Sequence, residues 1–407
     1  MRRAAPVLAI LLIGAALAGC GETPETLLPL ENPAAPGSSL PRLTRTGDTV
    51  LLSWVEVADS THTLRFSRWT GNDWSAPRTV ASGTDWFVNW ADFPSVRALG
   101  DGVLVAHWLA RVGEATYAYG VELAVSRDEG ASWSAPIVPH RDGTETEHGF
   151  VSLLPVLPDR MGVVWLDGRE TGGGEGGHDA HEEHGAGGPM TLRFTTIDAE
   201  GTLGEEVLLD DRVCDCCGTD AVLAGAARAL IVYRDRSDGE VRDISRVLES
   251  GAGWSAPAPV HEDGWTIAGC PVNGPAAASF GNRVAVAWFT GADDVGRVRV
   301  AFSEDGGEHF ESPITLDTPD PLGRVDVEMD PDGSAIVSWL EAGAGDAATI
   351  NVHRVTMQGK ESALFDPVPT RGDRASGFPQ LVRLGDRLIL AWTELGEPNR
   401  VRTAIYR

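Results

Sequence analysis

A strand-like stretch that ends in an aromatic residue recurs seven times along this chain of 407 residues. Apolar and small residues alternate toward the aromatic, as in Val284 to Trp288 (VAVAW) and Leu388 to Trp392 (LILAW), and a second strand-like stretch follows each copy. The seven aromatic residues are Trp54, Trp108, Trp165, Tyr233, Trp288, Trp339 and Trp392, spaced by 51 to 68 residues. Short alternating strands separated by turns indicate a repeated antiparallel β-meander.

This repeat predicts an all-β fold, a β-propeller of four-stranded antiparallel blades, because each such unit can bury its faces only against its neighbours in a ring. Seven copies favour seven blades, and six blades with one side hairpin is the alternative. The last copy reaches only its third strand before Arg407, so residues 26–30 are the candidate closing strand. We expect residues 38–407 to form one propeller domain, which 48 Gly and 25 Pro supply with turns.

The amino-terminal segment resembles a bacterial lipoprotein signal peptide. Arg2 and Arg3 precede an apolar run, and Leu17-Ala18-Gly19-Cys20 ends it with small residues and one cysteine. We therefore expect residues 1–19 to be removed, Cys20 to carry lipid, and residues 20–37 to form a flexible tether. The alternative is an uncleaved anchor, although the run is shorter than a membrane span requires. The propeller is thus predicted outside the cytoplasm, held to the cell envelope through lipid alone.

The net charge excludes some partners. The formal charge is −26 and no basic tract offsets it. Nucleic acid and anionic membrane surfaces are polyanions that such a chain repels. We therefore expect a small molecule, a glycan or a metal as the ligand.

A turn motif also recurs. Ser126 to Trp133 reads Ser-x-Asp-x-Gly-x-x-Trp, and Ser303 to Phe310 repeats it with Phe in the last place. The Asp carboxylate is suited to accept turn amides and Gly to adopt positive φ, so the motif serves the fold.

On these turns and the repeat, the chain resembles the sialidase superfamily of Asp-box (BNR) propellers. The strings Trp-Leu-Asp-Gly-Arg, Cys-x-Cys-Cys and Cys-Pro-Val-Asn-Gly-Pro are closest to uncharacterised sialidase-like bacterial lipoproteins. The resemblance implies cleavage of terminal sialic acids, with three arginines on the sugar carboxylate, a Tyr/Glu nucleophile pair and an Asp acid/base. The chain departs from it: no Arg-Ile-Pro string occurs, and the nearest is Leu40-Pro41-Arg42-Leu43.

Charged residues gather where the propeller topology predicts one rim. Carboxylates stand two residues beyond five of the aromatics, and arginines stand beside them, a mixture that suits a polar or anionic ligand. The predicted ligand-binding residues are Arg169, Arg234, Arg236, Glu56, Glu341 and Glu394, and the candidate catalytic residues, should the protein be a sialidase-type glycoside hydrolase, are Tyr233, Asp167 and Asp235. The structural alternative is that these acids cap their own loops or pair with adjacent arginines.

Four cysteines beyond Cys20 fall in two consecutive blade connections. Cys214, Cys216 and Cys217 precede the fourth unit and Cys270 precedes the fifth, while His178, His181 and His184 lie in a Gly-rich insertion of the third. We predict that all seven serve one soft-metal site for copper or zinc. Two disulfides or free thiols are the alternatives. His140, His148 and His261 also lie in blade connections, where they are open to a role at the rim.

The sequence therefore predicts a cell-envelope lipoprotein whose propeller binds a polar or anionic ligand, such as a glycan, or a soft metal. An exo-α-sialidase is the alternative.

Overall fold

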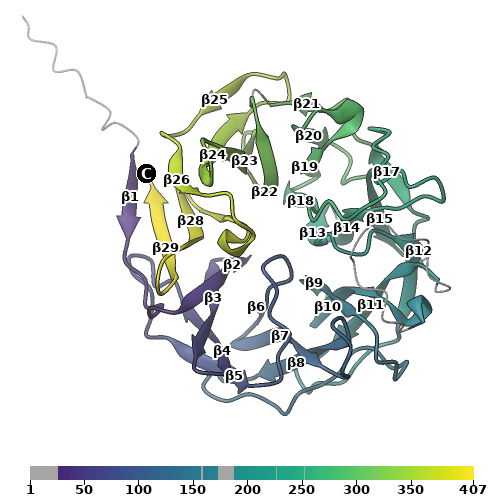
Figure 1. Ribbon diagram of the computed structural model, residues 1–407, viewed down its shortest axis with the longest axis vertical. Coiled ribbons are helices and arrows are strands. Elements are labelled where there is room, and N and C mark those ends of the chain that lie inside the picture. The colour runs from purple at the N-terminus through teal and green to yellow at the C-terminus, as the bar shows by residue number, and fades with distance from the viewer. Residues whose placement is uncertain (1–25, 157–158, 173–187, 226, 252, 317) are drawn as a thin grey trace, which may run out of the picture.

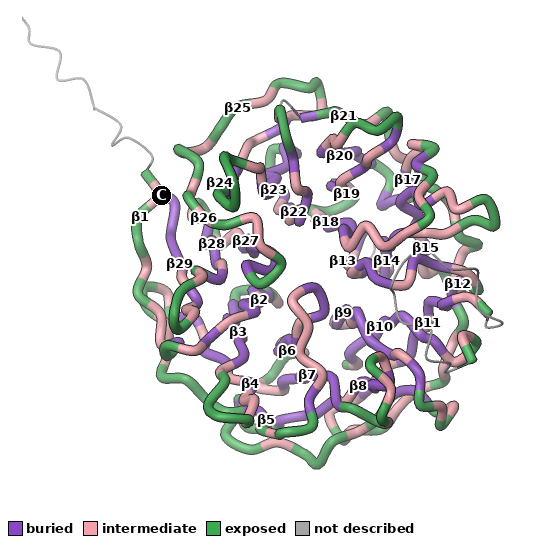
Figure 2. The backbone as a smooth tube through the Cα atoms, in the orientation of Figure 1, coloured by how far each residue is buried: buried purple, intermediate pink, exposed green. Residues whose placement is uncertain are grey.

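Seven antiparallel blades form a ring around a central channel, which confirms the predicted all-β propeller and its blade number (Figure 1). The computed structural model describes residues 26–407 except 157–158, 173–187, 226, 252 and 317. Exposed residues gather on the outer strands and loops, and buried ones inside the blades (Figure 2). Within the described residues, no helix is long and apolar enough to span a membrane.

Each of the first three blades runs outward from the channel in chain order. Blade 1 contains β2 (Ser38–Thr46), β3 (Thr49–Ala58), β4 (Thr61–Arg68) and β5 (Arg78–Gly83). Blade 2 contains β6 (Ser95–Gly100), β7 (Val103–Arg111) and β8 (Tyr119–Ser126), and a bridge between Leu123 and Ile137 marks its outer edge. Blade 3 contains β9 (His148–Val156), β10 (Arg160–Asp167), β11 (Met190–Ile197) and β12 (Val207–Val213).

The next three blades repeat this order. Blade 4 contains β13 (Asp220–Ala224), β14 (Arg228–Arg234), β15 (Ile244–Ser250), β16 (Gly253–Trp254) and β17 (Ala258–His261). Blade 5 contains β18 (Ala276–Phe280), β19 (Arg283–Thr290), β20 (Arg297–Ser303) and β21 (Ile314–Thr315). Blade 6 contains β22 (Pro321–Met329), β23 (Ala335–Ala342), β24 (Ala347–Val355), β25 (Glu361–Ala363) and β26 (Val368–Arg371). Short 3-10 turns are η1 (Arg169–Thr171), η2 (Ala292–Asp294) and η3 (Arg374–Ser376).

Blade 7 closes the ring with strands from both ends of the described chain. It contains β27 (Gln380–Leu384), β28 (Arg387–Glu394), β29 (Arg400–Tyr406) and, as its outer strand, β1 (Leu27–Leu30). Leu27 pairs with Tyr406 and Leu30 with Thr403 in antiparallel register. Such closure joins the first and last segments into one sheet, so the ring has no open blade edge at the junction.

The two ends of the ring carry different loops. At the turn rim, the turn between β6 and β7 meets the Asp-box turn after β8, where the Glu129 amide donates to the Gly102 carbonyl at 2.9 Å. The Asp128 carboxylate there accepts the Ser126 hydroxyl and the Ser132 amide, at 2.8 and 2.9 Å. At the connection rim, chain segments between blades lie beside the ends of second strands, as where the Cys214 amide donates to the Arg234 carbonyl at 3.0 Å.

Candidate functional site

Most carboxylates two residues beyond a strand tryptophan accept a hydrogen bond from the indole N–H of that tryptophan. Glu56 accepts the Trp54 indole N–H at 2.9 Å, and Asp167 accepts that of Trp165 at 2.7 Å. Glu341 does the same for Trp339 at 3.2 Å. Because an indole buried between blades needs an acceptor for its N–H, the recurring spacing has a structural cause. Glu394 instead forms an ion pair with Arg402 on the surface. These acids are therefore dispersed over the blades and form no common site.

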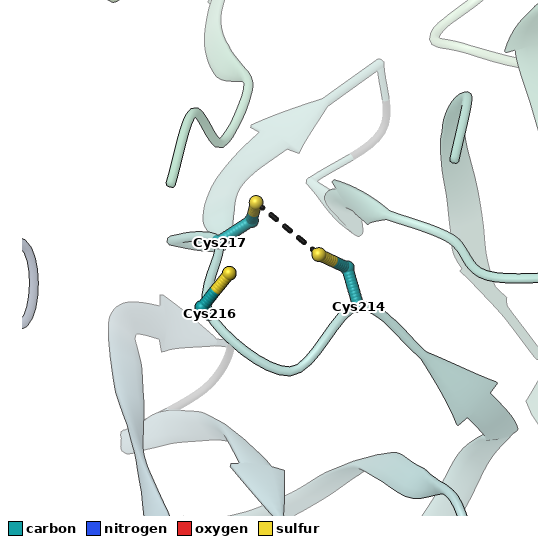
Figure 3. Close-up of side chains that lie close together, drawn as sticks. All are labelled: Cys214, Cys216 and Cys217. Atoms are coloured by element: carbon teal, nitrogen blue, oxygen red, sulfur yellow. Dashed lines mark hydrogen bonds between the residues drawn. The ribbon is translucent and has the colours of Figure 1, made fainter. Parts of the chain in front are cut away.

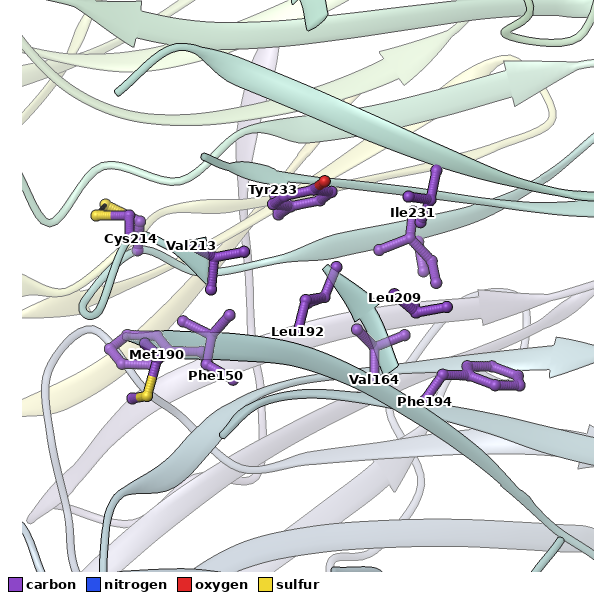
Figure 4. Close-up of a cluster of buried hydrophobic side chains, with 14 of the residues drawn as sticks. Phe150, Val164, Met190, Leu192, Phe194, Leu209, Val213, Cys214, Ile231 and Tyr233 are labelled. Atoms are coloured by element: carbon purple, nitrogen blue, oxygen red, sulfur yellow. Dashed lines mark hydrogen bonds between the residues drawn. The ribbon is translucent and has the colours of Figure 1, made fainter. Parts of the chain in front are cut away.

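Tyr233 replaces the tryptophan of blade 4 and is fully buried. Figure 4 shows it among Leu192, Val213 and Ile231, in the cluster that joins blades 3 and 4. Its hydroxyl donates to Asp210 of β12 at 2.5 Å. Asp235, which stands two residues beyond Tyr233, therefore does not bind the aromatic residue and instead accepts the Ser245 hydroxyl at 3.1 Å. Burial and the nearby Asp210 raise the pKa of Asp235 to about 6. The structure thus places Tyr233 and Asp235 together, but within the blades, while Asp167 lies in a separate ion-pair network.

Arg234 and Arg236 hold the connection rim together around blade 4. The buried Arg234 donates to the carbonyls of Asn273, Arg242 and Phe289, and its guanidinium lies 4.9 Å from the Trp265 ring centre. Arg236 pairs with Asp215 at 3.1 Å and with Glu240 at 2.8 Å. Both predicted ligand-binding arginines are therefore committed to protein partners.

A second group of charged residues lies where blade 2 connects to blade 3. We call His140, Asp142 and His148 the imidazole cluster. The two imidazole rings stack with centroids 3.9 Å apart. Asp142 reaches both rings, with Oδ1 3.4 Å from His140 Nδ1 and Oδ2 3.2 Å from His148 Nε2. His140 Nε2 accepts the Val121 amide, which fixes its proton on Nδ1, facing Asp142.

Asp167 and Arg169 extend the imidazole cluster into an ion-pair network. Arg169 binds Asp167 with two nitrogens at 2.7 Å each and reaches Glu206 at 2.8 Å. Burial alone would raise the pKa of Asp142, yet the Thr144 hydroxyl, His148 and Arg169 hold it well below its usual range. Burial, with the neighbouring His148, lowers the pKa of His140 to about 4. Of this group the sequence drew attention to the two histidines and to Asp167 and Arg169; Asp142, an ordinary loop acid in the sequence, is the residue that joins them.

The sulfur cluster, Cys214, Cys216 and Cys217, lies in the connection from blade 3 to blade 4, and its Sγ atoms all lie within 4.8 Å of one another (Figure 3). Cys214 Sγ is 3.3 Å from Cys217 Sγ, and both thiols are free. Cys216 forms a disulfide with Cys270. The structure therefore shows one disulfide beside two free thiols, an intermediate between the two disulfides and the free thiols that were the alternatives to a metal site.

Electrostatics distinguish the two free thiols. Arg242 donates to Cys214 Sγ at 3.2 Å and is held by Glu240 at 2.8 Å. Although burial works in the other direction, the Cys217 thiol and Arg242 lower the pKa of Cys214 to about 6, and burial raises that of Cys217. His178, His181 and His184, predicted to join this site, lie outside the described residues, as does Cys20.

The channel itself holds a polar cavity that sequence reasoning missed. Its volume is about 280 Å³, and the inner strands of all seven blades line it. Its charged and amide side chains are Arg42, Arg45, Arg97, Asp220, Asp326, Glu328 and Gln380. A smaller cavity of about 50 Å³ shares Arg42, Arg97 and Asp220 and extends toward Asp92 and Phe93. The repeat could have indicated these residues only once the inner strand of each blade was aligned.

Three channel-side acids tie neighbouring blades together. Asp92 accepts the Phe150 amide at 2.8 Å, Asp220 the Ala277 amide at 2.9 Å, and Asp326 the Leu381 amide at 2.7 Å. Inner strands of adjacent blades share no ladder, so these amides need side-chain acceptors. Burial raises the pKa of Asp92 to about 8 and that of Asp326 to about 6.

Aromatic rings meet beside the channel at the connection rim. Phe378 lies with its ring centre 5.9 Å from that of Trp90 and equally far from that of Phe93. The Arg42 guanidinium lies 5.6 Å from the Phe93 ring centre, donates to Gln380 at 2.8 Å and lies 3.8 Å from Asp220. Arg42 is thus a partly exposed cation between an aromatic face and two polar side chains.

Solved structures of other proteins share the β-propeller fold of this chain. The BP39L lectin from Burkholderia pseudomallei matches with a TM-score of 0.58 and 12% identity over 91% of this chain and 95% of the lectin. The Trypanosoma rangeli sialidase in complex with the inhibitor DANA matches with a TM-score of 0.50 and 15% identity over 91% of this chain and 60% of that one. This chain therefore spans less than two thirds of the sialidase.

A protein of unknown function from Dyadobacter fermentans matches with a TM-score of 0.48 and 14% identity, over 96% of this chain and 100% of that chain. No protein-family model matches the sequence, and no curated protein matches it. At these identities the likeness shows the propeller fold alone.

Proposed function

We propose that this protein is a lipid-anchored binding protein of the bacterial cell envelope that holds an acidic sugar at the mouth of its central channel. The observation that carries the proposal is the position of Arg42, which lines both cavities. A guanidinium binds a carboxylate through two parallel hydrogen bonds. The Phe93 face beside it adds the apolar surface that small-ligand sites combine with a few polar groups.

The arrangement favours binding over turnover. A sialidase-type hydrolase needs its tyrosine nucleophile and its carboxylates open to one cavity. Tyr233 is buried between blades and does not line the channel cavity, where Asp220 and Asp326 are committed to backbone amides. The neighbouring lectin and sialidase structures agree with a glycan ligand as a class.

Titration of the purified protein with N-acetylneuraminic acid, and with galactose as the uncharged probe, tests this proposal. We expect the acidic sugar to bind more tightly, and Arg42→Ala to weaken its binding by about tenfold or more, since a charge-assisted hydrogen bond contributes about 1.5–3 kcal/mol. Arg228→Ala at the turn rim is the matched control because, among the described residues, Arg228 pairs there with Glu308 and with the Asp305 carbonyl.

Two results would overturn the proposal. One is binding of the acidic sugar that Arg42→Ala leaves unchanged. The other is release of free sugar from a fluorogenic sialoside, abolished by Tyr233→Phe, which would establish the hydrolase instead.

The lipid anchor is a separate part of the proposal and rests on Leu17 to Cys20. Because one lipidated cysteine is the expected attachment, Cys20→Ser should move the protein from the membrane fraction to the soluble fraction after cell lysis. Ser39→Ala is a control of similar size in the mature chain. A Cys20→Ser protein that stays in the membrane fraction would contradict lipid anchoring.

A further inference from the structure

The sulfur cluster contains three sulfur atoms within 4.8 Å of one another, yet one of them is withheld by a disulfide. Cys214 and Cys217 are free, whereas Cys216 is bonded to Cys270, which arrives from the next blade connection. Figure 3 shows the three side chains converging from one short loop. Breaking the single bond to Cys270 would complete a group of three thiols on this loop.

The surroundings favour a compact anionic group at this place. Cys214, Cys216 and Cys217 continue the apolar cluster of blades 3 and 4, with exposed fractions of 0%, 8% and 1%. Figure 4 shows Cys214 at one end of that cluster, next to Val213. Buried thiolates need compensating charge, and Arg242 supplies it at 3.2 Å from Cys214 Sγ. Arg242 is fixed in turn by Glu240 at 2.8 Å, so the positive charge is already in position.

We propose that reduction of the Cys216–Cys270 disulfide creates a three-thiolate site for Cu(I) on Cys214, Cys216 and Cys217. Thiolates select soft ions over Mg²⁺ and Ca²⁺. Three sulfurs form a complete trigonal set for Cu(I), whereas a structural Zn²⁺ site takes four ligands and would also need the released Cys270 thiol. The proposal is independent of ligand binding in the channel.

The opening step is a thiol–disulfide exchange with a dithiol. A thiolate of the dithiol attacks Cys270 Sγ, the partly exposed end of the disulfide, and Cys216 leaves as a thiolate. The second thiol of the reagent then displaces Cys270, so the reagent becomes a cyclic disulfide and the protein gains two thiols. Two electrons and two protons pass from the dithiol to the protein. Cu(I) then replaces the protons that remain on Cys214, Cys216 and Cys217.

The test is anaerobic Cu(I) titration of the full-length protein against the chromophoric chelator bathocuproine disulfonate, before and after treatment with dithiothreitol and its removal. All proteins carry Cys20→Ser, so that no thiol outside the propeller contributes. We expect reduction to raise the affinity for one equivalent of Cu(I) at least 100-fold. X-ray absorption of the loaded protein should show three Cu–S contacts.

Two variants distinguish the role of the Cys216–Cys270 disulfide from that of the proposed Cu(I) ligands. Cys270→Ser frees Cys216 while keeping all three ligands, so it should bind one Cu(I) without reduction. Cys214→Ser removes a ligand and should lose the gain in Cu(I) affinity on reduction, and circular dichroism verifies that both variants keep the strand signal.

The proposal fails under any of three results. The untreated protein could bind Cu(I) as tightly as the reduced one, Cys270→Ser could bind none, or the reduced protein could retain Zn²⁺ in competition with Cu(I). Thiol counting on the denatured protein gives an independent readout, and two thiols before reduction and four after it are required.

Discussion

The imidazole cluster and the sulfur cluster lie in consecutive blade connections on the same rim, and each brings three metal-binding side chains within 4.8 Å. They differ in what surrounds them. In the imidazole cluster, Asp142 is matched by His148 and Arg169, and His140 is occupied by the Val121 amide. In the sulfur cluster, the neighbours are apolar side chains and the Arg242 guanidinium, which is paired with Glu240.

This difference shows that ligand types and spacing do not by themselves make a metal site. A carboxylate between two imidazoles and a guanidinium already has its counter-charges, so an added cation would compete with partners in place. The buried Cys214 thiol lies beside the guanidinium of Arg242, which Glu240 holds in position, and this favours ionisation of Cys214. We therefore interpret the imidazole cluster as an element of stability and the sulfur cluster as an element of chemistry.

Removing the central carboxylate of the imidazole cluster is the most direct way to break this comparison. Asp142→Asn keeps the shape but leaves His148 and Arg169 with less compensating charge, and we expect a loss of about 3 kcal/mol in the free energy of unfolding. Urea denaturation followed by tryptophan fluorescence measures it.

Cys217→Ala is the matched change in the sulfur cluster and should cost only about 1 kcal/mol, because it removes one buried sulfur that forms no ion pair. Equal losses in the two variants, or a loss of bound metal from the purified protein on Asp142→Asn, would contradict the contrast drawn here.

The sequence was sufficient for the fold because the repeat is a direct consequence of blade packing. Trp54, Trp165, Trp288 and Trp339 occupy equivalent buried places, so one buried indole in each of these copies leaves a visible period. The channel site was not visible, since Arg42 and Gln380 lie 338 residues apart and meet only when the ring closes. The acids two residues beyond the tryptophans were recognisable in the sequence. Their spacing does not by itself indicate a ligand site, because three of them accept a hydrogen bond from the indole N–H.

The sulfur cluster was predictable in part. Three cysteines within four residues are conspicuous in the sequence. The propeller topology also correctly predicted that Cys270, in the next blade connection, lies beside them. What the sequence could not decide was the pairing, because that depends on which Sγ atoms the loop turns toward each other. The place of Asp142 was equally hidden, since its role arises from two histidines that stack from opposite ends of one connection.

A smaller effect, on pH dependence, sharpens the comparison further. Burial and His148 lower the pKa of His140 to about 4, while an unfolded histidine titrates near 6.5. As pH falls through that window, the unfolded chain takes up the proton first, so the folded state loses stability between pH 6.5 and pH 4. Asp142 and Asp167, the carboxylates that face His140, soften this loss without reversing it.

We expect the free energy of unfolding to fall by about 1 kcal/mol between pH 8 and pH 6 through this group, and His140→Gln to flatten that slope. Glutamine can still accept a hydrogen bond from the Val121 amide. The variant therefore removes the titration of residue 140 while keeping this hydrogen bond. Arg228→Ala at the turn rim, measured over the same range, should keep the slope of the parent protein in this window. A slope that His140→Gln leaves intact would assign the acid sensitivity to another group and remove the electrostatic basis for treating the imidazole cluster as complete without a metal.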